Sequence, residues 1–554
     1  MDPRWPSKSK LYVSGADHNP RMQKIGIIAV SIVFIFVLIG GCFVFSPSLV
    51  YNVEKSSSSY FTVVVDCGSS GTRVNIYEWK LQGRLNNNGD LPILLNTYPG
   101  NLTKSDGCQY HCMQTEPGLD KFVGNAFGVR SSLDPLLHWA ERLVPRERRE
   151  FTPIFVLATA GMRKLPVEDA RVILEDVADV VKDFGFLYKK DWIRVLSGKE
   201  EAYYGWIALN YKMGVLGNSL GSHTLGLLDL GGSSLQLVVE VDELKIDNYV
   251  FNSKIGSPEH QIVPYSLPAF GLNEAFDRTV VMLSRTQALK ESPGGAFEVR
   301  HPCLCSGFVQ NYTCLSCFQR EPISSDLGSH INANAILLLG EPNWEMCKSL
   351  TRAVATNSSR GDWSLVHDHA SCSGLSSYGG NELLNLMLNS SSVTRYHALS
   401  GFFAVYQMLN LSPRANLTRM WETGQQLCSQ SWEDHQGIGG AYCFRFLYMI
   451  SLIQDALCLS KREIVFGPGD VSWTLGAALI EGQYLWSDAT KYQYGIFYLK
   501  HSKMLSSSVA LFLLLLCLLL IVYRSQIKLP MPGGKPTASR ASLPSYIYSK
   551  RQPN

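Results

Sequence analysis

The chain has 554 residues, of which 46% are hydrophobic and 18% charged, so it is long enough for roughly two to four domains with hydrophobic cores. Its 50 lysines and arginines nearly balance its 47 aspartates and glutamates, and a net charge of +3 gives no electrostatic footprint for nucleic acid. The 46 glycines and 25 prolines are ordinary numbers and no short repeat is present, which excludes a disordered, collagen-like or coiled-coil chain.

The first predicted element is an apolar run of 21 residues, 25–45, that contains no charge. At roughly 1.5 Å per residue, a helix of this length crosses an apolar layer of about 30 Å, so we expect a transmembrane helix. A cleaved signal peptide is the alternative, but the run exceeds the apolar part of such signals and lacks a small-x-small cleavage site. The tail before it, 1–24, carries five basic and two acidic residues, which predicts a cytoplasmic location.

A linker at 46–60, with four consecutive serines, precedes the predicted folded part. The sequence FTVVVD (61–66) reads as a buried strand, a GSSGT turn follows, and VNIYEW (74–79) reads as a returning strand. A strand at 152–159, a helix at 167–183, a strand at 192–197 and another helix from residue 198 come next. This alternation predicts α/β layers.

The most informative feature is an internal echo, because VVVDCGSSGT (63–72) is matched by LLDLGGSSLQ (227–236). Each segment is an apolar strand, then an aspartate, then a run of glycine and serine. The aspartates, Asp66 and Asp229, lie 163 residues apart (229 minus 66), about one domain length. We therefore expect two similar domains that face each other across a cleft.

Glycine and serine at the end of a strand let successive backbone N–H groups turn toward one point, and such a loop suits a phosphate. Two facing loops, each preceded by an aspartate, supply a phosphate cradle and oxygen ligands for Mg²⁺ or Ca²⁺. The alternative is that both segments are ordinary β-turns. Hydrolysis of a phosphate also needs a base, for which Glu200 and Glu201 are candidates. For Glu200 we favour the alternative, in which the acid only complements the dipole of the helix that it opens.

Other catalytic motifs are absent or misplaced. The chain has no GxxxxGK[ST] and no HExxH. A GxSxG string at 217–221 follows a predicted helix and precedes a predicted strand, the reverse of a nucleophile elbow, so we interpret it as a loop.

Cysteines and glycosylation sequons place the middle of the chain in an oxidising compartment. Twelve of the 14 cysteines lie between residue 45 and residue 505, where we expect disulfides of undetermined connectivity. A zinc site is the alternative for the set at 303, 305, 314 and 317. Six Asn-x-Ser/Thr sequons share that region: Asn101, Asn311, Asn357, Asn389, Asn410 and Asn416.

A second uncharged run, 505–523, predicts another transmembrane helix. The tail after it, 524–554, carries six basic residues and no acid, so both tails are expected in the cytoplasm. The region between the spans would then lie outside the cell or in the Golgi lumen.

At this point the motifs resemble those of a known family, the apyrases or ecto-nucleoside triphosphate diphosphohydrolases. The resemblance rests on five ordered segments: VVVDCGSSGTR (63–73), LATAGMR (157–163), SGKEEAYYGW (197–206), LLDLGGSSLQ (227–236) and a C-terminal group made of GFFAVYQMLNL, YCFRFLYMISL and SWTLGAAL. Within the family, the sequence is most similar to those of membrane-bound plant apyrases. Alanine at 202 and leucine at 235 depart from the family pattern and put substrate preference and rate in doubt.

The resemblance implies an α/β fold of two actin-like, ribonuclease H-like lobes with a cleft between them. The first lobe would comprise 61–197 and a return segment at 462–490, and the second lobe 198–461. The transmembrane helices would flank this pair.

The resemblance also implies roles for single residues. Glu201 would activate the attacking water, with Ser234 and Gln236 holding it and Thr159 close to a phosphate. Asp66 and Asp229 would anchor Ca²⁺ or Mg²⁺. The phosphates would be bound by small residues of the two loops: Gly68, Ser69, Ser70, Gly71, Gly231, Gly232 and Ser233. Phe403 and Tyr448 would sandwich the nucleobase, with packing in the core as the alternative for both.

Together these features predict a two-span membrane enzyme that hydrolyses nucleotides of the ATP, ADP, UDP and GDP class by direct attack of water. It would work on the extracellular or Golgi-lumenal side, and oligomers are possible. A lumenal diphosphatase for UDP or GDP is the first alternative, and a non-catalytic nucleotide receptor is the second.

Overall fold

The computed structural model describes residues 59–80, 91–100, 113–216, 223–241, 250–255, 259–287, 290–292, 296–313, 335–356, 387, 393, 395–429, 441–483 and 485. The chain divides into two compact units, Met1–Gln483 and Tyr484–Asn554, and of the second unit only Leu485 is described. Both predicted membrane spans lie outside these residues. Among the described residues, no helix is both long and apolar enough to cross a membrane.

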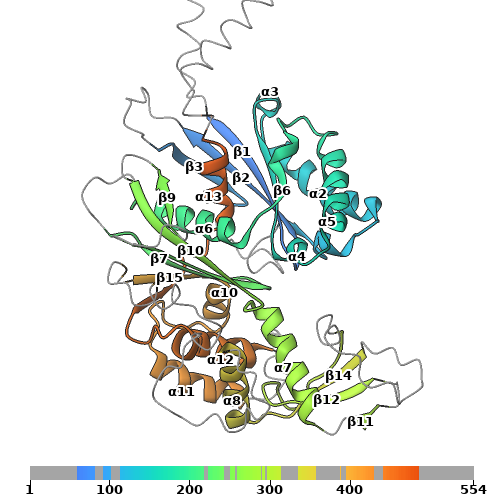
Figure 1. Cartoon of the computed structure of the whole chain (residues 1–554), viewed down its shortest axis with the longest axis vertical. Coiled ribbons are helices and arrows are strands. Elements are labelled where there is room, and N and C mark those ends of the chain that lie inside the picture. Colours follow the sequence, from blue (N-terminus) through green and yellow to red (C-terminus); the bar gives the residue numbers. More distant parts are fainter. Residues whose placement is uncertain are drawn as a thin grey trace, which may run out of the picture. The chain divides into compact units, whose positions relative to one another are not determined.

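The first sheet has the strand order β3-β2-β1-β5-β6, with β4 paired to β2 (Figure 1). Its strands are β1 (Tyr60–Cys67), β2 (Thr72–Lys80), β3 (Ile93–Tyr98), β4 (Gln114–Thr115), β5 (Ile154–Ala158) and β6 (Ile193–Val195). The strand β2 is antiparallel to both of its neighbours, β1 and β3, and β5 and β6 run parallel to β1. Its helical segments are η1 (Leu119–Lys121), α2 (Ala126–Leu143), α3 (Arg146–Arg149), α4 (Ala160–Arg163), α5 (Val167–Val181) and η2 (Lys190–Trp192).

The second sheet repeats this plan, with the order β10-β8-β7-β15-β16 and the extra strand β9 beyond β10. Its strands are β7 (Gly226–Leu230), β8 (Ser234–Glu240), β9 (Phe251–Lys254), β10 (Glu259–Pro268), β15 (Arg395–Ser400) and β16 (Glu463–Phe466). The strands β7, β8 and β10 are antiparallel, and β15 and β16 run parallel to β7. The internal echo in the sequence therefore marks two sheets with the same order and the same strand directions.

Helices α6 (Gly198–Lys212) and α13 (Trp473–Glu481) follow the last strand of each sheet and pack against each other (Figure 1). They cross closely, since a Cβ added at Gly476 would come within 1.9 Å of the Tyr204 carbonyl oxygen. Helix α6 contacts β7, β8 and β10 of the second sheet, whereas α13 contacts β1 and β2 of the first. Each sheet is thus covered on one face by the helix that follows the other sheet.

The alternation of side chains along β1 and β7 decides which residues face this helical layer. In β1, Val63 and Val65 belong to the core shared with α2 and α5, so Asp66 points to the opposite face. In β7, Leu228 and Leu230 belong to the other large core, and a Cβ at Gly205 of α6 would lie 3.9 Å from Asp229 Oδ2. Both aspartates consequently face the layer formed by α6 and α13.

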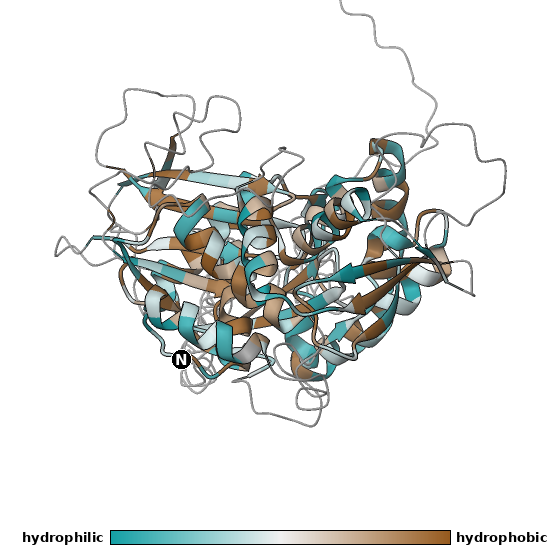
Figure 2. Cartoon of the chain, turned by 90° about the horizontal axis from the view of Figure 1, so that it is seen from below, coloured by the Kyte–Doolittle hydropathy of each residue, from teal (hydrophilic) through white to brown (hydrophobic). Residues whose placement is uncertain are grey.

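A third sheet, with four strands, is formed by residues between β10 and β15 of the second sheet. Its strands are β11 (Lys290–Glu291), β12 (Phe297–His301), β13 (Val309–Thr313) and β14 (Ala335–Gly340), in the order β11-β12-β14-β13. Helix α7 (Leu272–Thr286) contacts β12 of this sheet, and the other helices described after it are α8 (Trp344–Ala355), α10 (Gly401–Met408), α11 (Leu417–Cys428), α12 (Tyr442–Ser451) and the π-helical η7 (Leu452–Ala456). In Figure 2, hydrophobic residues colour long stretches of strand, while the helices alternate between hydrophobic and hydrophilic residues.

Disulfides confirm the expectation drawn from the cysteines. Cys303 pairs with Cys347 and Cys428 pairs with Cys443. Cys305 is a buried thiol that lies 3.3 Å from the Tyr442 hydroxyl. A zinc site at the cysteine set is therefore contradicted for Cys303, while 314 and 317 lie outside the described residues, as does the GxSxG string.

The predicted elements are found with small shifts at their ends. The predicted strands at 152–159 and 192–197 are β5 and β6, and the helix predicted over 167–183 is α5. Strand β16, within the predicted return segment 462–490, pairs with β15 of the second sheet, and only α13 contacts the first. The boundaries of the two lobes stay predictions.

Candidate active site

The first predicted phosphate loop, residues 68–71 (the first loop), joins β1 to β2. The Gly68 N–H donates to the Gly71 carbonyl at 3.0 Å, which closes the turn. Ser70 is exposed and accepts a hydrogen bond from Arg73 Nη2 at 3.2 Å, and another nitrogen of Arg73 lies 3.6 Å from Asp66. The backbone of the loop packs tightly: a Cβ at Gly118 would come within 2.5 Å of the Gly68 carbonyl oxygen.

The second predicted phosphate loop, residues 231–234 (the second loop), joins β7 to β8 with the same turn. The Gly231 N–H donates to the Ser234 carbonyl at 2.9 Å, the bond equivalent to the one that closes the first loop. The first N–H groups of α7, from Leu272 and Asn273, donate to the carbonyls of Gly231 and Gly232 at 3.0 and 2.9 Å. Helix α7 thereby holds the second loop in place.

The two loops touch. Ser233 Oγ donates to Ser69 Oγ at 3.1 Å, across 164 residues of sequence. A Cβ added at Gly232 would lie 3.5 Å from the same Ser69 oxygen. The structure thus brings together the small residues that the sequence predicted to bind phosphate from two sides.

Asp66 and Asp229 lie at the ends of β1 and β7 and are each only 8% exposed. Burial raises the pKa of Asp66 to about 6, with Arg73 lowering it and the neighbouring Asp229 carboxylate raising it further. Burial also raises the pKa of Asp229, against a hydrogen bond from Ser400 that lowers it. The Asp229 carboxylate therefore adds to the effect of burial on Asp66.

Asp66 Oδ1 is buried without a hydrogen-bond partner in the described part of the chain. The same part contains no cluster of three or more His, Cys, Asp or Glu residues that could hold a metal ion. Two carboxylates with a free oxygen fit a cation that takes its remaining oxygens from water and phosphate, as Mg²⁺ usually does.

Glu201 lies in the first turn of α6, with 13% of its side chain exposed. Arg163 Nη2 donates to its Oε2 at 2.9 Å. Burial raises the pKa of Glu201 to about 7; Arg163 lowers it, and Asp66 and Asp229 raise it. Both predicted aspartates of the site therefore act electrostatically on Glu201.

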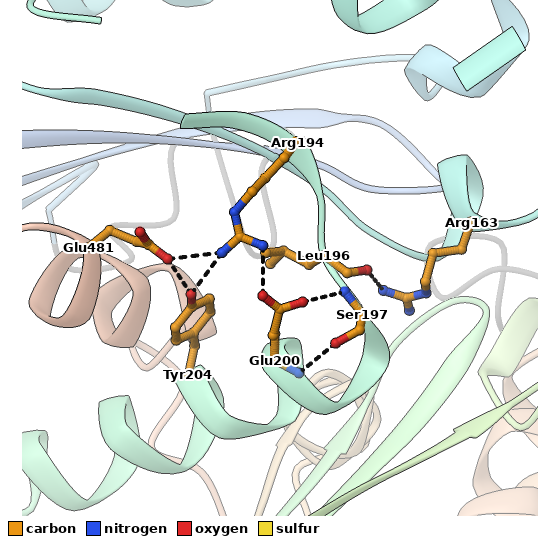
Figure 3. Close-up of polar contacts among 7 residues, drawn as sticks. All are labelled: Arg163, Arg194, Leu196, Ser197, Glu200, Tyr204 and Glu481. Atoms are coloured by element: carbon orange, nitrogen blue, oxygen red, sulfur yellow. Dashed lines mark hydrogen bonds and ion pairs between the residues drawn. The ribbon is translucent and has the colours of Figure 1, made fainter. Parts of the chain in front are cut away.

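The N-terminal turn of α6 is fixed by a network of charged groups (Figure 3). Ser197 and Glu200 form a capping box, with the Ser197 N–H donating to Glu200 Oε2 at 2.8 Å. Arg194 of β6 donates to Glu200 Oε1 at 2.7 Å, to Glu481 of α13 at 2.9 Å and to the Tyr204 hydroxyl at 3.2 Å. Glu200 thus caps the helix and pairs with Arg194, which is more than the complement to the helix dipole that the sequence predicted, and it holds the helix turn that carries Glu201.

The predicted water-holding pair is also together. Gln236 Nε2 donates to Ser234 Oγ at 2.8 Å, and both residues are buried at the start of β8. Thr159 follows β5, is 5% exposed, and donates its N–H to the Cys67 carbonyl at 3.1 Å, directly before the first loop.

The two predicted stacking aromatics differ. Phe403 is half-buried, and its ring lies against Gly467 and Gly469, where an added Cβ would come within 3.1 and 2.1 Å. Tyr448 has no exposed surface: its hydroxyl donates to the Phe270 carbonyl at 2.8 Å, and its ring stacks on Phe444. The structure therefore corrects the stacking role of Tyr448 in favour of core packing, because no face of its ring is open to a nucleobase.

Several residues of this site were missed by the sequence reasoning. Arg163 and Ser400 partner Glu201 and Asp229, and Lys164 contacts Ser233. Arg163 ends the motif LATAGMR, which is the one signal that could have indicated it. The partners of the other two lie too far away in sequence to be paired from spacing.

Comparisons with known proteins agree with these motifs. The family model described as GDA1/CD39 (nucleoside phosphatase) matches residues 52–491. A protein named probable apyrase 7 of Arabidopsis thaliana is 36% identical over 486 residues, which is 84% of this chain and 62% of that protein. The chain therefore spans less than two thirds of the length of that relative.

Two further similarities bear on function and on fold. The guanosine-diphosphatase of Schizosaccharomyces pombe is 33% identical over 270 residues, 46% of this chain and 45% of that protein. A crystal structure of nucleoside triphosphate hydrolases from Neospora caninum covers 80% of this chain and 96% of its own, with a TM-score of 0.51 and 14% identity. At that identity the likeness shows a shared mixed α/β two-lobe fold.

Proposed function

The chain belongs to the GDA1/CD39 (nucleoside phosphatase) family, and we propose that it hydrolyses nucleoside tri- and diphosphates to monophosphates and phosphate. The observation that carries this proposal is the contact between the two loops. The hydroxyls of Ser69 and Ser233 are 3.1 Å apart at the ends of two strands that each present a buried aspartate. Such a pair of loops offers donors on both sides of one phosphate chain.

We infer that Asp66 and Asp229 hold Ca²⁺ or Mg²⁺, mainly through its water shell. The free Oδ1 of Asp66 and the negative charge of Asp229, which raises the pKa of Asp66, support this assignment. A bound cation offsets the negative charge of the transferring phosphoryl group.

Glu201 is the proposed base. A carboxyl with a pKa of about 7 is matched to accepting a proton from water near neutral pH. Arg163 orients it through Oε2, while Ser234 and Gln236 supply a hydroxyl and an amide for the same water. Water attacks the phosphorus directly, so no phosphoenzyme is expected.

The nucleobase contributes little to selectivity in this proposal. Phe403 offers a half-buried ring for stacking, which any base can use.

A diphosphatase for UDP or GDP is the second candidate, and the similarity to a guanosine-diphosphatase favours it. Phosphate release from ATP, ADP, UDP and GDP, each with Ca²⁺, Mg²⁺ or EDTA, separates the two. Comparable rates with ATP and ADP support an apyrase, and a preference for diphosphates supports the alternative. Release of phosphate from none of them, or undiminished release in EDTA, contradicts the proposal.

We further propose that the chain crosses a membrane twice, with cytoplasmic tails and the catalytic region outside the cell or in the Golgi lumen. The two apolar runs and the basic tails support this topology. The two disulfides also support it, since such bonds persist in oxidising compartments. Asn311 and Asn416, two of the sequon residues, are exposed and so accessible to glycosylation.

A further inference from the structure

Lys164 joins the two halves of the candidate site. It is the residue that follows α4, and its Nζ donates to Ser233 Oγ of the second loop at 3.4 Å. The same ammonium group forms an ion pair with Glu274, in the first turn of α7. One side chain from the first half of the chain therefore reaches two residues that belong to the second.

The hydroxyl that Lys164 contacts is the one that bridges the loops. Ser233 Oγ lies 3.4 Å from Lys164 Nζ on one side and 3.1 Å from Ser69 Oγ on the other. A phosphate oxygen that accepts hydrogen bonds from both serines would lie within reach of the ammonium group. Ser233 is also the neighbour of Ser234, which we assign to the attacking water, so the phosphate in question is the terminal one.

The two side chains of the ion pair differ in how exposed they are and so in how freely they can move. Half of the Lys164 side chain is exposed (51%), whereas only 19% of the Glu274 side chain is. The backbone of Glu274 is fixed as well, since its N–H points to the Gly232 carbonyl at 3.4 Å. Lys164 is thus the partner that can turn toward a new anion.

We propose that Lys164 binds the terminal phosphate of the nucleotide and that Glu274 competes with this phosphate for the ammonium group. The inference rests on the proposed function, because it needs a nucleotide tail between the two loops. A phosphate group carries more negative charge than one carboxylate and offers several acceptor oxygens, so it wins the competition when bound. With no nucleotide bound, Glu274 keeps Lys164 beside the second loop.

A purely structural role for the pair predicts a different result. If Lys164 and Glu274 only tie the two halves together, removing either residue has the same effect on turnover. If the phosphate competes with Glu274, the two removals act in opposite directions. The sign of the two effects is therefore the test.

The experiment measures KM and kcat for ATP and ADP with the full-length chain in detergent. Lys164→Met should raise the KM for ATP about tenfold, the loss of one half-exposed charge-assisted hydrogen bond, and leave kcat within about threefold. Lys164→Arg should keep KM within about threefold of the wild type. Glu274→Gln should lower KM about threefold, because it frees the ammonium group.

Lys182 provides a matched control, since its side chain is also 51% exposed and is paired with Asp179 on α5, away from both loops. Lys182→Met and Asp179→Asn should leave KM unchanged. Equal KM values for Lys164→Met and wild type, or changes of the same sign in the Lys164 and Glu274 variants, would overturn the proposal. An inactive wild type would contradict the proposed function instead, and the affinities of the same variants for a non-hydrolysable ATP analogue would still decide the role of Lys164.

Discussion

Glu201→Gln should remove turnover and at the same time stabilise the fold at alkaline pH. Glutamine has the size of glutamate, and its carbonyl oxygen can still accept the hydrogen bond that Arg163 Nη2 donates at 2.9 Å. The substitution therefore removes the basic oxygen with little change in position. Loss of a general base costs about 10²- to 10⁴-fold in kcat, or roughly 3 to 5 kcal/mol in the barrier.

The effect on stability follows from the raised pKa. Burial raises the pKa of Glu201 from 4.5 to about 7, so the folded state holds this proton more tightly than the unfolded state does. Below pH 4.5 Glu201 is protonated in both states and does not destabilise the wild type. As the pH rises from 4.5 through 7, the free energy of unfolding of the wild type falls. At pH 8 the penalty approaches about 3 kcal/mol, at 1.36 kcal/mol per pKa unit. Glutamine carries no such penalty.

Two measurements on the same proteins test both parts. Phosphate release from ATP at pH 7 should be reduced at least about 100-fold in the variant. Urea unfolding in EDTA at pH 5 and pH 8 should show the variant more stable by about 2 to 3 kcal/mol at pH 8 and by much less at pH 5. Turnover at the wild-type rate would refute the assignment of the base, and a variant that is less stable at pH 8 would refute the reasoning about its burial.

Four further substitutions test other parts of the site. Arg194→Met removes the guanidinium that holds the first turn of α6, so kcat should fall about tenfold with KM nearly unchanged, because Glu201 loses its position; unchanged steady-state kinetics would argue against this. Gly271→Ala should destabilise the protein by about 1 to 3 kcal/mol and lower kcat/KM, because the added Cβ would come within 2.3 Å of the backbone of the second loop; urea unfolding and kinetics measure both. Phe403→Ala should raise KM for ATP, ADP, UDP and GDP by similar factors, whereas Tyr448→Leu, which removes the ring, should leave all four KM values unchanged; a rise in KM with Tyr448→Leu would restore its stacking role.

The two aspartate-tipped hairpins could be predicted because everything that makes them is local. A buried strand, an aspartate and a turn of glycine and serine are contiguous in the sequence, and the structure closes both turns with equivalent hydrogen bonds, from Gly68 and from Gly231. Partners that come from elsewhere in the chain could not be paired in this way. Arg163 reaches a residue 38 positions away and Lys164 one 110 positions away, and no periodicity or propensity encodes such contacts.

Tyr448 shows the same limit of prediction from local sequence. Its place in the motif YCFRFLYM was compatible with a role at the site and with a role in the core. Helical spacing states which residues share a face of α12, but not what that face meets. In the folded chain this face is buried: the Tyr448 ring stacks on Phe444 of the same helix, and its hydroxyl donates to the Phe270 carbonyl from another part of the chain.

The exchange of helices between the two sheets explains why the proposed base comes from α6. The hairpins after β1 and β7 are equivalent and can supply the same groups twice, two aspartates and two sets of phosphate donors. A single attacking water needs one base, and a third equivalent group cannot come from either hairpin. Helix α6 leaves β6 of the first sheet and crosses to the face of the second, so its first turn passes the point where both aspartates face. Helix α13 makes the reverse crossing, and its Glu481 shares Arg194 with Glu200. The two crossings are equivalent, but the first turn of α6 carries Glu200 and Glu201 whereas the first turn of α13 carries no acid, so the single base comes from the sequence of α6.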